Sequence, residues 1–187
     1  ADLGGDVEVA GDATGRQEAA LGAEHCEQDP EDDKSEGRSD LGPLEDAAAA
    51  YDRSDYSTAA RLYLPLAEQG SAQAQYSLGF MYSTGRGVAQ DSATALAWYR
   101  KAAESGHASA QNNLGVMYAD GRGVEKDDAK AIHWYEKAAE QGDAKAQFNL
   151  GVIFAGKGTD KDDAQAVRWY QKAADQGIAD AQVNLGN

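Results

Sequence analysis

The stretch that decides the fold is AQNNLGVMYADGRGVEKDDAKAIHWYEKAAEQG, residues 110–142. Related copies are AQYSLGFMYSTGRGVAQDSATALAWYRKAAESG at 74–106 and AQFNLGVIFAGKGTDKDDAQAVRWYQKAADQG at 146–177. The first three copies begin 36 residues apart, and a fourth start follows after 35. A fixed period in this range indicates a stacked array of repeats, in which each unit packs against its neighbours.

Each unit is predicted to hold two helices. In the first helix of the central copy, Ala110, Leu114, Met117 and Tyr118 fall at positions i, i+4, i+7 and i+8. That spacing places them on one apolar stripe. The second helix carries the pattern A-x-x-W-Y-x-K-A-A-E and ends at a glycine. The predicted fold is therefore all-α, with tandem helix-turn-helix units.

A glycine recurs in the middle of the first helix, at Gly115 in the central copy. Glycine inside a helix costs about 1 kcal/mol relative to alanine. Its recurrence predicts that a bulky side chain of the second helix, Trp134 or Tyr135, needs the space. The equivalent glycines are Gly79, Gly151 and Gly186.

The inter-helix loop reads G-R-G-V at 85–88 and again at 121–124. Its first glycine suits a left-handed helix cap, and we expect the valine to pack into the core. Residues 156–159 read G-K-G-T instead, so we expect a different turn there. Helix N-caps before each second helix are predicted at Asp91, Asp127 and Asp162, and C-terminal caps at Gly106, Gly142 and Gly177.

Charge divides the chain into two segments. Residues 1–43 contain 13 acidic and 3 basic residues, a net charge of −10, and few large apolar residues. They are predicted to be a disordered acidic tail. Residues 44–187 carry a net charge of −5 and are predicted to form the solenoid. Its units are a degenerate repeat at about 44–70, full repeats at 71–106, 107–142 and 143–177, and a partial repeat at 178–187.

Composition excludes several classes of function. Neither segment offers a basic face, which argues against binding nucleic acid or an anionic membrane. No apolar run is long enough to cross a bilayer, and no signal peptide is visible. His25 and Cys26 stand together without further ligands, and His107 and His133 are predicted to be surface residues. We therefore expect no metal site and no cofactor.

The repeated pattern A-x-x-x-L-G-x-hydrophobic-aromatic, then G-R-G-V-x-x-D, then A-x-x-W-Y-x-K-A-A-E-x-G, resembles the Sel-one-like repeat (SLR). This family is a variant of the tetratricopeptide repeat, and the match covers roughly residues 44–187. The resemblance implies a right-handed α/α superhelix that acts as a protein-interaction adaptor. Its members are commonly bacterial, which favours a periplasmic or secreted location.

Enzyme signatures are absent from the sequence. It contains no H-E-x-x-H, no G-x-S-x-G, and no serine followed three residues later by lysine. The missing serine–lysine spacing matters because some SLR proteins have been described as binding or hydrolysing β-lactams. The G-R-G-V loops lack the G-K-[ST] end of a phosphate-binding loop. We predict that the protein is not an enzyme, and keep a weak cell-wall-type hydrolase as an alternative.

Polar residues recur one position before the Leu-Gly pair of each first helix. In tetratricopeptide-like superhelices the first helix lines the concave groove, and an amide there can donate to and accept from a peptide backbone. Amides in this row are equally compatible with bonds between adjacent repeats. Tyr76, Asn112 and Phe148 vary between copies, and we expect them on an exposed face that encodes specificity. The recurring row is Ser77, Asn113, Asn149 and Asn184.

Two further rows recur. A glutamine row at positions 75, 111, 147 and 182 is predicted to be structural. The tryptophans at 98, 134 and 169 are predicted to belong to the core rather than to an aromatic recognition stripe.

The predicted function is therefore a non-enzymatic adaptor that binds a protein or peptide in the groove. Besides the hydrolase, the alternative is a structural scaffold that associates end to end.

Overall fold

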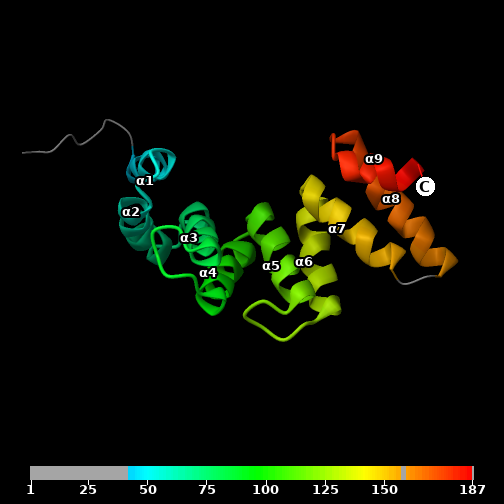
Figure 1. Cartoon of the computed structure of the whole chain (residues 1–187), viewed down its shortest axis with the longest axis horizontal. Coiled ribbons are helices and arrows are strands. Elements are labelled where there is room, and N and C mark those ends of the chain that lie inside the picture. Colours follow the sequence, from blue (N-terminus) through cyan, green and yellow to red (C-terminus); the bar gives the residue numbers. More distant parts are fainter. Residues whose placement is uncertain (1–41, 157–158, 187) are drawn as a thin grey trace, which may run out of the picture. The chain divides into compact units, whose positions relative to one another are not determined.

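The computed structural model describes residues 42–156 and 159–186, and those residues form helices without a β-strand (Figure 1). The predictions for the acidic tail at 1–41 lie outside the described residues. The helices are α1 (Pro43–Asp52), α2 (Tyr56–Glu68), α3 (Ala72–Thr84), α4 (Ser92–Glu104), α5 (Ala108–Asp120), α6 (Asp128–Glu140), α7 (Ala144–Ala155), α8 (Asp160–Asp175) and α9 (Ala179–Gly186).

The helices pack in chain order, each against the helix before it and the helix after it (Figure 1). The largest interfaces join α3 to α4, α5 to α6 and α7 to α8, which are the two helices of one predicted unit. The all-α repeat solenoid predicted from the period is confirmed.

The core of each full repeat contains a leucine, a tyrosine and several alanines. Leu78, Leu114 and Leu150 are almost fully buried on α3, α5 and α7. Alanines with no exposed surface allow the second helices to approach closely. They include Ala102, Ala138 and Ala173, at equivalent positions of α4, α6 and α8.

The recurrent mid-helix glycine faces a tyrosine. A Cβ atom built on Gly79 or Gly115 would lie 2.6 Å from the ring of Tyr99 or Tyr135. The prediction of a bulky partner on the second helix is confirmed, and the partner is the tyrosine. The neighbouring tryptophans are partly buried against the core. A lysine lies over each ring: Lys101 over Trp98, Lys137 over Trp134 and Lys172 over Trp169.

Glycine geometry explains the two G-R-G-V loops. Gly85 and Gly121 end α3 and α5 in the left-handed conformation, with φ of 73° and 71°. A Cβ atom on Gly87 would lie 2.2 Å from the carbonyl oxygen of Tyr56, at the start of α2. The loop therefore needs glycine both for its dihedral angle and to lie against the preceding repeat. Val88 and Val124 pack against the core, as predicted.

The last loop departs from the predicted N-cap. Asp91 and Asp127 cap α4 and α6, but the prediction that Asp162 caps α8 is wrong. Helix α8 begins at Asp160, and its N-cap is Thr159, whose hydroxyl accepts from the backbone N–H of Asp162 at 3.2 Å. The threonine offers a cap earlier in the chain, so the helix gains residues at its start.

Candidate functional site

The predicted polar row lies on the first helices of successive repeats. Ser77 is on α3, Asn113 on α5, Asn149 on α7 and Asn184 on α9. The first three are half-buried and Asn184 is exposed. The structure therefore places each of them one residue before a leucine that packs into the core.

Most residues of this row interact with a tyrosine hydroxyl of the preceding repeat. Burial raises the pKa of Tyr99, and side-chain interactions with Ser83 and Asn113 partly oppose that rise. Burial likewise raises the pKa of Tyr63, opposed by a hydrogen bond with Ser77. Asn184 stands in the same relation to the tyrosine of α8. Three of the four residues in the row therefore interact with a tyrosine of the preceding repeat.

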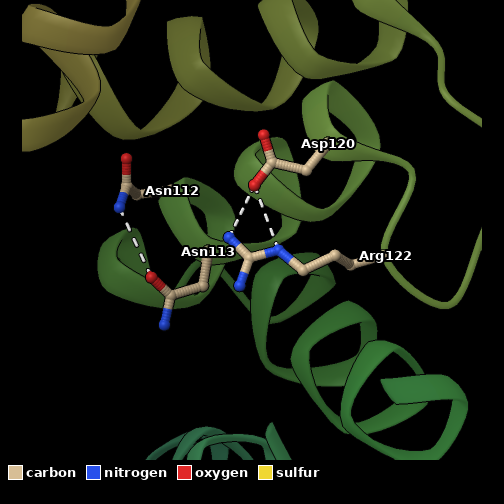
Figure 2. Close-up of polar contacts among 4 residues, drawn as sticks. All are labelled: Asn112, Asn113, Asp120 and Arg122. Carbon is tan, nitrogen blue, oxygen red and sulfur yellow. Dashed lines mark hydrogen bonds and ion pairs between the residues drawn. The ribbon is translucent and has the colours of Figure 1, made fainter.

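Asn149 uses a different internal partner. Its Nδ2 donates to Oδ1 of Asn112 at 3.0 Å and so links α7 to α5. Asn112 in turn donates to Oδ1 of Asn113 at 3.4 Å (Figure 2). The amides of two repeats are thus joined in a chain, as the alternative of bonds between adjacent repeats predicts.

Of Tyr76, Asn112 and Phe148, which were predicted to lie on an exposed face, Asn112 contradicts the prediction. Asn112 is 6% exposed, because it turns towards the α5–α7 interface. Tyr76 and Phe148 are half-buried, and their rings pack on Tyr99 and Tyr170. Aromatic residues at this position contact the tyrosine that packs on the mid-helix glycine, whereas the asparagine of α5 makes hydrogen bonds.

The glutamine row is structural, as predicted. Gln75 and Gln111 are buried, and each donates its Nε2 at 3.0 Å to a carbonyl near the end of the preceding second helix. Gln111 also accepts a 2.7 Å hydrogen bond from Gln141. Gln147 repeats both interactions, the second with Gln176 at 2.8 Å. These amides join successive repeats and are not available to a partner.

Three hollows lie along the face that carries the polar row. The aromatic hollow, of about 230 Å³, is lined by Tyr51, Tyr63, Tyr76, Ser77 and Phe80. The central hollow, of about 290 Å³, is lined by Phe80, Ser83, Thr84, Gln90, Ser92, Tyr99, Asn113, Val116, Met117 and Arg122. The distal hollow, of about 250 Å³, is lined by Tyr76, Ser109, Asn112, Asn113, Asp143, Ala144, Lys145 and Ile178.

The three hollows share walls. Phe80 separates the aromatic hollow from the central hollow, and Asn113 belongs to both the central and the distal hollow. Tyr76 lines the aromatic and distal hollows. Residues of α1, α3, α5 and the start of α7 thus border three neighbouring concavities.

The two G-R-G-V arginines have different surroundings. Arg86 donates to the hydroxyl of Tyr51 at 2.5 Å, and its guanidinium lies 5.5 Å from the ring centres of Tyr56 and Phe80. Arg122 instead pairs with Asp120 through Nε and Nη2, at 3.0 and 2.6 Å (Figure 2). The repeated motif did not predict this difference, because it depends on residues outside the motif, both in the same repeat and in the preceding one.

His107 has a structural role that the sequence reasoning missed. It is half-buried, caps the N-terminus of α5 and accepts from the backbone N–H of Ala110 through Nδ1 at 3.2 Å. Its Nε2 lies 3.2 Å from Oε1 of Gln73, and its ring stacks on Tyr76. Burial lowers its pKa. The signal was its alignment with Ser71 and Asp143, the caps of α3 and α7.

The described residues contain neither a candidate metal centre nor a candidate membrane span. No group of three or more His, Cys, Asp or Glu side chains there is arranged to hold a metal ion. No helix in the described part of the chain is long and apolar enough to cross a membrane.

The model of the Sel1 repeat matches four consecutive segments, residues 48–71, 72–107, 108–143 and 144–178. The chain belongs to the Sel1 repeat family. The first matched segment begins inside α1, within the degenerate unit. Each of the other three segments contains one pair of helices: α3 with α4, α5 with α6, and α7 with α8. Sel1 repeat proteins generally mediate protein–protein interaction, and their fold is typically a non-catalytic scaffold.

Two solved structures place this Sel1 repeat protein among relatives. A Sel1 repeat protein from Oxalobacter formigenes is 35% identical with a TM-score of 0.72, over 78% of this chain and 59% of that one. The protein c5321, a protective antigen of uropathogenic Escherichia coli strains with an SLR fold, is 38% identical with a TM-score of 0.69. That match covers 76% of this chain and 32% of c5321, so this chain spans well under two thirds of either relative. No curated protein matches the chain.

Proposed function

We propose that this Sel1 repeat protein is a non-enzymatic adaptor that binds an extended peptide segment of another protein. The segment lies along the face bordered by α1, α3, α5 and α7. The observation that carries this proposal is the sharing of walls among the aromatic, central and distal hollows. Adjacent hollows that share lining residues suit an extended chain of residues better than a compact small molecule.

The chemistry of the face suits a peptide. Tyr51, Tyr63, Tyr76 and Phe80 offer an aromatic wall to an apolar side chain. Next to it, Asn113 offers an amide at the boundary of the central and distal hollows. An amide has two N–H donors and two acceptor lone pairs, and Asn112 occupies only one lone pair of Asn113, so this amide keeps hydrogen-bonding capacity for a peptide backbone.

The polar row therefore contributes unequally to the proposed groove. Ser77 and Asn113 line hollows, whereas Asn149 is bonded to buried Asn112. Asn184 is exposed on α9. We place the peptide contacts at Ser77, Asn113 and Tyr76, and assign Asn112 and Asn149 to the join between repeats.

A display library of random peptides, panned on the full chain, tests this proposal. We expect enriched peptides whose affinity falls about tenfold with Asn113→Ala, since removing one hydrogen-bonding group costs about 1–3 kcal/mol. Glu136→Ala, at an exposed site on α6, is the matched control and should leave affinity unchanged. Peptides that bind both variants as tightly as the original protein would remove Asn113 from the groove. Failure to enrich any peptide would count against the adaptor itself.

The two alternatives predict other results. A self-assembling scaffold predicts a mass in solution that rises with concentration, measurable by light scattering. A weak cell-wall-type hydrolase predicts turnover of a chromogenic β-lactam above the rate in buffer.

A further inference from the structure

At the central hollow, small side chains replace the aromatic residues that surround the equivalent arginine one repeat earlier. Around Arg86, the rings of Tyr56 and Phe80 cover the guanidinium. The positions 36 residues further on are Ser92 and Val116, and both line the central hollow together with Arg122. Smaller side chains thus line the central hollow beside Arg122, whereas aromatic rings lie against Arg86 one repeat earlier.

The wall of the central hollow carries hydrogen-bond donors and one positive charge. Asn113 contributes an amide and Arg122 contributes the guanidinium, whereas the hydroxyl of Ser83 donates to the carbonyl of Phe80 and pairs with that of Tyr99. None of the residues that line this hollow is an aspartate or glutamate. The set matches a carboxylate, which accepts hydrogen bonds and carries the opposite charge.

The present partner of Arg122 is weakly held. Both nitrogens that bond to Asp120 reach the same oxygen, Oδ2, so the pair is not the two-oxygen fork that favours arginine with a carboxylate. The two side chains are 60% and 51% exposed, and exposed ion pairs contribute little. Nη1 of Arg122 makes no hydrogen bond to any residue in the described part of the chain.

We propose that the central hollow is a carboxylate subsite of the peptide-binding face. An acidic side chain or the C-terminal carboxylate of the bound peptide displaces Asp120 from Arg122. It binds the guanidinium, with the amide of Asn113 beside it (Figure 2). The neighbouring aromatic hollow, reached past Phe80, takes an apolar residue of the same peptide. This inference rests on the proposed function, because it names the peptide that the face selects.

The same display library tests the subsite separately from the groove. Peptides enriched on the original chain should share an acidic residue, or a free C-terminus, at a fixed distance from an apolar residue. Synthetic versions with that acid changed to its amide should bind about tenfold more weakly or worse. Amidating only the C-terminus, or changing only an internal Asp to Asn, shows which carboxylate is bound.

Two variants at the hollow complete the test. Arg122→Gln should abolish the preference for the acidic peptide over its amide version, while affinity for the amide version is retained. Asp120→Asn should strengthen binding of the acidic peptide, because it removes the competing carboxylate. Lys126→Gln, exposed in the same loop, is the matched control and should leave the preference intact. Enriched peptides without a carboxylate, or a preference that survives Arg122→Gln, would overturn the subsite and leave the groove standing. No enrichment would overturn both.

Discussion

A Cβ atom added to Gly115 of α5 would lie 2.6 Å from Cε1 of Tyr135 on α6. Real Cβ contacts are essentially never that short. Equivalent contacts join Gly79 to Tyr99 and the glycine of α7 to Tyr170. The tyrosine ring therefore fixes the spacing of the two helices in each full repeat, at the cost of a glycine in mid-helix.

Gly115→Ala should destabilise the protein although alanine favours helix. The propensity gain is about 1 kcal/mol, but overpacking a tight core typically costs about 1–3 kcal/mol. We expect a lower denaturation midpoint, followed by circular dichroism in urea. Gly186→Ala is the control, because a Cβ atom there has no neighbour within 4 Å among the described residues. A Gly115→Ala protein more stable than the original would refute the ring as the reason for the glycine.

Ser105→Gln should stabilise the protein, because Gln75 lacks a bond that its equivalents have. Oε1 of Gln75 is buried without a partner in the described structure, whereas Gln111 accepts from Gln141. Position 105 is the equivalent of position 141, and its serine is too short to reach. A glutamine there would supply the missing N–H, for a gain of about 0.5–1.5 kcal/mol.

The matched control for this change is Ser105→Glu. Glutamate has nearly the same length, but above its pKa it has no N–H to donate. Urea denaturation of both variants at neutral pH separates the hydrogen bond from added contact area. Equal gains from glutamine and glutamate would show that the amide donor is not the cause.

The helix pairs and the glycine–tyrosine contacts were predictable from sequence because each depends on spacing within one repeat. The interactions that distinguish one repeat from another were not. Arg86 and Arg122 occupy the same motif position, and their surroundings differ because Ser92 and Val116 stand beside Arg122 where Phe80 and, from the preceding repeat, Tyr56 pack on Arg86. Such a contact is visible only when two repeats are stacked in space.

Polar residues of the candidate site were partly predictable for a related reason. Their recurrence indicated a row on the first helices, but an asparagine can bond to a peptide, a tyrosine hydroxyl or another amide. Asn112 is buried because Asn149 of the next repeat bonds to it. The choice among partners depends on side-chain positions that a one-dimensional pattern does not contain.

Thr159→Ala should destabilise α8, because Thr159 rather than Asp162 is its N-cap. Losing a threonine cap costs about 1 kcal/mol. Asp162→Asn keeps the backbone N–H that Thr159 accepts, so we expect it to have a smaller effect. Amide hydrogen exchange of the first turn of α8 measures both. Faster exchange in Asp162→Asn than in Thr159→Ala would instead support Asp162 as the N-cap, as predicted from sequence.

Acid should weaken the protein through His107. Its Nδ1 accepts from Ala110 only when that nitrogen is unprotonated, and Nε2–H then donates to Gln73. Burial lowers the folded pKa below the unfolded value of about 6.5. The unfolded chain therefore binds the proton first. This contribution to stability is fully present above about pH 6.5 and is lost as the pH falls towards the folded pKa.

His107→Ser tests this pH dependence, because serine is the cap at the equivalent position of α3 and does not titrate. Between pH 7.5 and 5.5 we expect the original protein to lose more unfolding free energy than this variant does. The expected difference is a steeper slope against pH, measured by urea denaturation at several pH values. His133→Ser, at an exposed site on α6, should keep the original slope. Parallel slopes for the original protein and His107→Ser would show that the cap does not sense protons, since every other titrating group is common to both.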